Sequence, residues 1–66
     1  MDIVMNGKAV CVVEPISVLD LLRQHGLEGK RLAVELNGEI VPKSQHAQIS
    51  LKNGDKLEIV LAVGGG

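Results

Sequence analysis

The first residues of the chain alternate between apolar and polar side chains with the two-residue period of a β-strand. Residues 1–6 place three apolar side chains on one face, which is typical of a half-buried strand. The Asn6-Gly7 pair then predicts a hairpin, because both central residues of a type I′ turn need positive φ. Residues 8–13 should return as an antiparallel strand. They are apolar on both faces, so the pattern does not say which of them point inward.

One amphipathic helix is predicted after the hairpin. Ser17 is suited to cap its start, and Asp20 supplies the acidic residue of a capping box. The helix is expected over residues 18–25, with Gly26 as its stop and Leu27 folded back over its end. Its apolar stripe follows the i, i+3, i+4, i+7 spacing and consists of Val18, Leu21, Leu22 and His25.

The second half of the chain returns to strand patterns. Residues 31–36 alternate, and Asn37-Gly38 predicts a turn into a short strand over residues 39–41. Pro42 confines that strand to an edge, because proline has no N–H to donate. Residues 43–48 are polar and predict a loop or a single helical turn.

The last strand is expected over residues 56–63 and should lie in the middle of the sheet beside the first strand, because it is too apolar for an edge. A single helix covers only one face of a sheet, so the other face should be open. The predicted fold is therefore α+β, a mixed sheet packed on one helix. Residues 1–63 form the domain, and residues 64–66 form a flexible C-terminal glycine tail.

The chain finishes with Val63-Gly64-Gly65-Gly66. Glycines have no side chain to pack and lose the most backbone freedom on ordering, so they do not stabilise a fold. A disordered terminus is the plain alternative. A tail that lies flat in a narrow channel of another protein would explain each glycine, and it would present the α-carboxylate of Gly66.

Composition removes several classes of function. The chain has no aromatic residue to stack on bases, and its net charge of −1 leaves no basic stripe for nucleic acid or membrane lipids. It has no apolar run long enough to span a membrane and no basic signal-peptide start. The single cysteine, Cys11, cannot form an internal disulfide, and a cytoplasmic protein is expected.

Few residues are candidates for chemistry of their own. Cys11 is expected to be a small buried hydrophobe, His25 a helix-end residue and His46 a surface loop residue. Their spacing fits no metal site. The carboxylates are scattered, although Glu58 on the outward face could steer a basic partner. A chain of 66 residues also has little room for a deep pocket, so it is not expected to be an enzyme.

The chain resembles the ubiquitin-like β-grasp sulfur carriers, and among them the ThiS family of thiamine biosynthesis. The resemblance covers essentially the whole chain. It is carried by Ile3-Val4-Met5-Asn6-Gly7, residues 17–22, Gly26-Leu27, residues 33–42, residues 54–60 and Val63-Gly64-Gly65-Gly66.

The resemblance implies that this chain is a carried reactant. A ThiF-like adenylating enzyme would use ATP and magnesium to adenylate Gly66, and this chain would bind no cofactor or metal itself. A persulfide donor would then leave a thiocarboxylate on Gly66 for a ThiG-like thiazole synthase. The residues expected to contact partners are Val60, Ala62, Val63, Gly64, Gly65 and Gly66.

Two alternatives remain at this point. One is a carrier like the small subunit of molybdopterin synthase, a family that also ends in two glycines. The other is a non-covalent β-grasp interaction module that binds through its open sheet face. Val60 and Ala62, together with Val4, would form an apolar docking patch there, although plain sheet packing explains each of them singly.

Overall fold

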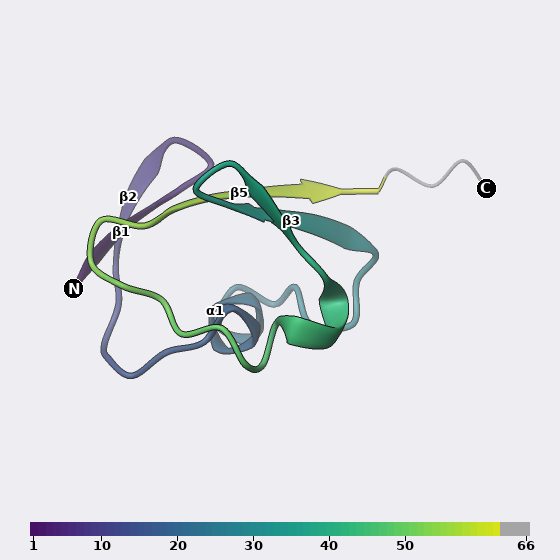
Figure 1. The fold of residues 1–66 in the computed structure, drawn as a ribbon, viewed down its shortest axis with the longest axis horizontal. Coiled ribbons are helices and arrows are strands. Elements are labelled where there is room, and N and C mark those ends of the chain that lie inside the picture. Colours follow the sequence, from purple (N-terminus) through teal and green to yellow (C-terminus); the bar gives the residue numbers. More distant parts are fainter. Residues whose placement is uncertain (63–66) are drawn as a thin grey trace.

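The computed structural model describes residues 1–62. In chain order the elements are β1 (Asp2–Met5), β2 (Lys8–Cys11), α1 (Val18–Gln24), β3 (Leu32–Leu36), β4 (Glu39–Val41), the 3₁₀ helix η1 (Lys43–Gln45) and β5 (Lys56–Leu61) (Figure 1). The predicted helix and strands are all present, with slightly shorter ends. The polar segment after β4 holds the single helical turn η1. Residues 63–66, which include the predicted flexible tail, lie outside the described residues.

The strands form one mixed sheet in the order β2-β1-β5-β3-β4. β5 lies in the middle, as predicted. It runs parallel to β1 and antiparallel to β3, while β1–β2 and β3–β4 are antiparallel hairpins. Helix α1 crosses one face of this sheet, and the opposite face is left open (Figure 1). The prediction of a mixed sheet on one helix is therefore confirmed.

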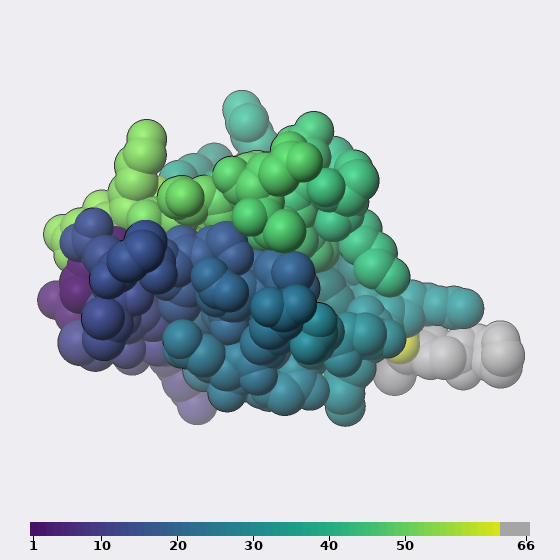
Figure 2. All heavy atoms as spheres, turned by 90° about the horizontal axis from the view of Figure 1, so that it is seen from below, coloured from purple at the N-terminus to yellow at the C-terminus, as the bar shows by residue number. Residues whose placement is uncertain are grey.

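The hydrophobic core fills the space between the sheet and α1. Alternate residues of β5, Leu57 and Ile59, point into it, and Val18, Leu21 and Leu22 meet them from the helix. Each buried aliphatic side chain of this size contributes about 1.5–3 kcal/mol. Figure 2 shows this side of the molecule, where α1 and the segment that contains η1 lie next to each other over the sheet.

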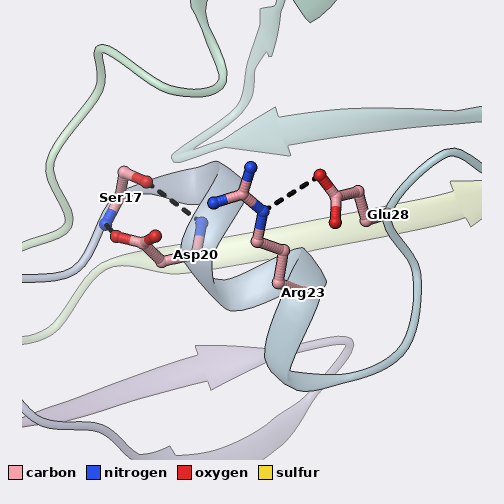
Figure 3. A network of polar contacts seen from close by, with 4 residues as sticks. All are labelled: Ser17, Asp20, Arg23 and Glu28. Atoms are coloured by element: carbon pink, nitrogen blue, oxygen red, sulfur yellow. Dashed lines mark hydrogen bonds and ion pairs between the residues drawn. The ribbon is translucent and has the colours of Figure 1, made fainter.

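Both ends of α1 are held by local hydrogen bonds. The Asp20 N–H donates to the Ser17 hydroxyl at 3.0 Å, and the Ser17 N–H donates back to the Asp20 carboxylate at 3.0 Å (Figure 3). Hydrogen bonding of the Asp20 carboxylate to the Ser17 backbone N–H, and secondly to the Ser17 side chain, lowers the pKa of the Asp20 carboxyl. At the other end, the Leu27 N–H donates to the Leu22 carbonyl at 2.8 Å. The predicted capping box and the folded-back Leu27 are both confirmed.

Candidate docking face

The open face of the sheet carries the partner-contacting residues that were predicted on β5. Val60 is 63% exposed, and Ala62 is also exposed just beyond the strand. Both alternate with the buried Ile59, so they point away from the core. Their role in binding a partner stays a prediction. The remaining predicted contacts, Val63 to Gly66, lie outside the described residues.

The neighbours of Val60 on this face come from β3 and not from β1. Val60 is paired with Ala33, whereas Val4 is paired with Lys56, four residues earlier on β5. At about 3.3 Å per residue, Val4 therefore lies roughly 13 Å back along the strand. The predicted grouping of Val4 with Val60 and Ala62 is wrong in this respect, because the parallel register places Val4 beside the beginning of β5.

A pair of carboxylates lies next to Val60 on the open face. Glu58 of β5 is directly opposite Glu35 of β3, and Glu35 is in turn opposite Ile40 of β4, which is 64% exposed. Within residues 1–62 neither glutamate has an ion-pair partner. Like charges directly opposite each other destabilise a sheet. The docking face is defined here as Ala33, Glu35, Ile40, Glu58, Val60 and Ala62.

Two asparagines hold β5 from its two sides. The Asn6 side-chain oxygen accepts from the Ile59 N–H at 2.7 Å, and its amide donates to the Ile59 carbonyl at 3.2 Å. On the β3 side, the Asn37 side chain accepts from the Lys56 N–H at 2.9 Å and donates to Asp55 at 3.0 Å. The hairpin pattern predicted these residues only for their positive φ, which is 51° at both. In addition, their side chains connect the turns to the central strand.

The end of β5 is also fixed to its neighbour. Leu61 is paired with Leu32, and the Ala62 N–H donates to the Arg31 carbonyl at 2.9 Å. Leu61 points to the helix side but is 47% exposed, because it lies at the margin of the core. Sheet hydrogen bonding therefore continues to the last described residue before the glycine segment.

A groove on the helix side was not predicted. It has a volume of about 560 Å³ and lies between α1, the loop before β3 and the segment after β4. The groove is open along one side, so the expectation of little room for a deep pocket is not contradicted. Leucines line its floor, and its rim carries Lys30, Arg31 and Lys43. Within residues 1–62, no cluster of His, Cys, Asp or Glu side chains is arranged to hold a metal ion.

His46 differs from its predicted position, and His25 differs in part. His46 was expected on the surface but is only 6% exposed, and its Nε2 lies 3.2 Å from the Val41 carbonyl oxygen. The hydrogen bond to the edge strand explains how a polar ring is accommodated in the interior. His25 caps the end of α1 as predicted, yet it is exposed and does not extend the apolar stripe, since the helix stops at Gln24.

Cys11 was expected to be buried, but its side chain is exposed. It is paired with Asp2 on the open face, while its neighbours Val10 and Val12 point toward the core. Because β2 is apolar on both faces, the sequence pattern does not show which way the Cys11 side chain points. Separately, none of the helices in the described part of the chain has the length and apolar character to cross a membrane.

Comparison with known proteins identifies the family. The model of the ThiS family matches residues 3–66. The chain belongs to the ThiS family. The sulfur carrier protein ThiS of Bacillus subtilis (strain 168) is 40% identical over 63 residues, which cover 94% of this chain and 96% of that protein. The crystal structure of the thiamine biosynthesis protein ThiS from Geobacter metallireducens matches with a TM-score of 0.85, at 32% identity and full coverage of both chains.

A larger relative contains a similar sequence as one part. A thiazole synthase of Paramagnetospirillum magneticum is 46% identical over 66 residues, which are all of this chain and 20% of that protein. This chain thus spans one fifth of that relative. Together these matches confirm the ThiS-type β-grasp fold and the role of a sulfur carrier in thiamine biosynthesis.

Proposed function

We propose that the α-carboxylate of Gly66 is the group that carries sulfur. A partner enzyme with bound ATP and magnesium adenylates it and releases pyrophosphate. The sulfur of a persulfide donor then attacks the acyl carbon, AMP leaves, and a thiol cleaves the S–S bond so that a thiocarboxylate remains. This chain binds neither ATP nor magnesium and acts as a reactant rather than as an enzyme. We propose that it acts in the cytoplasm, because the single cysteine, Cys11, cannot form an internal disulfide.

The observation that carries this proposal is the fixed base of the glycine segment. Ala62 is held to β3 by the bond to the Arg31 carbonyl, and Asn6 ties the same strand to the β1 side. A partner that recognises the folded domain therefore finds Ala62, the last described residue, at a defined point. Reacting groups gain most when their position is set before reaction.

The docking face supports a partner with basic and apolar groups. Val60 and Ile40 are exposed aliphatic side chains, and Glu35 and Glu58 lie between them without ion pairs in residues 1–62. A cation from a partner would relieve the repulsion of the two carboxylates, and complementary charge accelerates encounter. We propose that the adenylating enzyme docks on this face.

The thiazole synthase relative supports the proposal that thiazole synthase accepts the sulfur. It carries a region that is similar to this whole chain within the same polypeptide. A carrier region joined to an enzyme reacts with it at a high effective concentration. We therefore propose that thiazole synthase also accepts the sulfur from the thiocarboxylate of this chain.

The test is the intact mass of the chain after incubation with the adenylating enzyme, ATP, magnesium and a persulfide donor. Replacement of oxygen by sulfur changes the mass almost as much as oxidation of Met1 or Met5, so the change must be mapped to the C-terminal peptide. We expect an ATP-dependent change at Gly66, and none when Gly66 is deleted or one residue is added after it. An unchanged Gly66 would refute the proposal if the Bacillus subtilis ThiS is thiolated in a parallel reaction.

A second test concerns the docking face. Val60→Asp and Ala62→Asp should slow thiocarboxylation about tenfold at limiting partner concentration, equivalent to ~1.4 kcal/mol. Ala47→Asp is the matched control, because Ala47 is exposed on the helix side of the molecule. Equal rates for all three variants would show that the partner does not dock on this face.

A further inference from the structure

The two edges of the sheet are built differently. β4 is three residues long, begins with Glu39 and is followed directly by Pro42, which has no N–H to offer. Short strands, charges and proline are the features that keep an edge from pairing with another chain. The opposite edge strand, β2, is four residues long and begins with Lys8, but the five residues after this lysine are apolar and the next proline, Pro15, lies four residues beyond the end of the strand. The β2 edge is therefore the one left able to pair.

The register shows which backbone groups point outward from this edge. Val12 exchanges two hydrogen bonds with Met1, at 2.7 and 2.8 Å, so the backbone N–H and C=O groups of Val12 point toward β1. In an antiparallel pair the residues alternate between facing the partner strand and facing away. The N–H and C=O groups of Ala9 and Cys11 therefore point away from the sheet, and pairing that extends β2 beyond Cys11 would turn those of Val13 the same way. Val13 is also 82% exposed, which is the highest value among the large apolar side chains of residues 1–62.

We propose that a second copy of this chain pairs with this edge, antiparallel and centred on Cys11. Residues whose numbers add to 22 would then lie opposite each other. Cys11 meets Cys11 of the second copy, and Ala9 meets Val13 of the second copy, both through their outward-pointing backbone groups. The hydrogen-bonding residues of one edge thus coincide with those of the other.

The charges at the two ends of the segment are complementary in the same register. Lys8 lies opposite Glu14 of the second copy, and Glu14 lies opposite Lys8 of the second copy. Both side chains are exposed, and within residues 1–62 neither has an ion pair. Opposite charges in directly opposed positions stabilise a strand pair, whereas like charges destabilise it. The segment from Lys8 to Glu14 is therefore self-complementary in backbone pattern, side-chain polarity and charge.

This arrangement is independent of the proposed function. The pairing joins two sheets edge to edge, so it covers neither of the two docking faces. The two-fold relation directs the β5 strands of the two copies in opposite directions, so their C-terminal ends lie far apart. Each copy can then meet its own adenylating partner.

Charge exchange tests the register directly. In a dimer, Lys8→Glu places a glutamate opposite a glutamate at both ends of the paired segment, and Glu14→Lys places a lysine opposite a lysine at both ends. Each single variant should self-associate at least tenfold more weakly than the unchanged chain in sedimentation over a rising concentration series. An equal mixture of the two variants, and the Lys8→Glu/Glu14→Lys double variant, should recover the original association. Lys52→Glu is the matched control and should leave it unchanged, because Lys52 is exposed and lies outside β2.

Amide chemical shifts give the second readout. In the unchanged chain, the amides of Ala9, Cys11 and Val13 should shift and gain protection from solvent exchange as concentration rises. Far-ultraviolet circular dichroism will show that all variants remain folded. Concentration-independent amides in the unchanged chain would overturn the proposal. So would a mixture of the two single variants that sediments like its components.

Discussion

Replacing Asn6 by glycine should loosen the strand that leads to the glycine segment. Asn6 has a φ of 51°, a value that glycine adopts without steric strain, so the Asn6→Gly change leaves the hairpin backbone in place. It removes only the side-chain amide, which binds both the N–H and the carbonyl of Ile59. The parallel ladder itself contains only the register pairs Val4–Lys56 and Met5–Leu57. The Asn6 side chain therefore extends the contact between β1 and β5 beyond the end of β1.

The size of the effect follows from these two hydrogen bonds. Their lengths are 2.7 and 3.2 Å, and both are partly buried. A hydrogen bond of this kind contributes about 1 kcal/mol net. Because water can replace part of the lost bonding, Asn6→Gly should cost about 1–2 kcal/mol. In a domain of this size each kcal/mol lowers Tm by about 4–8 °C.

The assay is thermal unfolding combined with native-state hydrogen exchange. The Ile59 amide should exchange faster in Asn6→Gly than in the unchanged chain. Asn37→Gly is the matched control, because Asn37 has the same φ of 51° but makes its side-chain bonds at exposed positions near the start of β5. That variant should cost less and should leave Ile59 protected. If both variants lose the same stability and Ile59 exchange is unchanged, Asn6 does not hold β5.

Four further predictions concern stability. Ser17→Ala should cost about 1 kcal/mol in denaturant unfolding, because the Asp20 N–H loses its acceptor. The pKa of Asp20 is lowered in the folded chain, so its stabilisation is present above the unfolded value of about 4 and is lost as the pH falls through the folded value. The Asp20→Asn variant should accordingly show less loss of stability on acidification, and an identical acid profile would contradict this. His46→Ala should cost about 2 kcal/mol by leaving the Val41 carbonyl without its bond to the buried ring, and an unchanged Tm would contradict this. Ile59→Ala should cost about 2–5 kcal/mol and Val60→Ala less than about 0.5 kcal/mol, since these neighbours on one strand point to opposite faces. Similar losses for both would contradict the assigned faces.

The features that could be predicted from the sequence are those with a strong local signal. Alternation defined the first and last strands, two of the three Asn-Gly pairs defined the hairpins, and Ser17 with Asp20 defined the start of the helix. The central place of β5 followed from its apolar character, because an exposed edge disfavours such a strand. Each of these inferences needs only residues that are close in the sequence or the general rule that apolar surface is buried.

The features that could not be predicted depend on register between distant segments. The position of Val4 relative to Val60 is set by the parallel pairing of β1 with β5, which are separated by most of the chain. The exposure of Cys11 depends on which face of an evenly apolar strand meets the helix. The polar composition of residues 43–48 favoured a surface loop, yet the ring of His46 is buried because β4 supplies an acceptor for it. In each case a nonlocal contact decided the outcome.

The position of β5 explains how so short a chain holds the residues that precede the glycine segment. On one side, five register pairs with β3 continue to Leu61, and the Ala62 bond to Arg31 extends them by one residue. On the other side, β1 and the Asn6 side chain hold the strand up to Ile59. An edge strand would have only one such set of bonds, and a pull on the chain end would peel it away. Up to Ile59, separating β5 from the sheet breaks hydrogen bonds on both sides, whereas residues 60–62 are bonded on the β3 side alone, so a pull on this end should release those three residues before the rest of the strand.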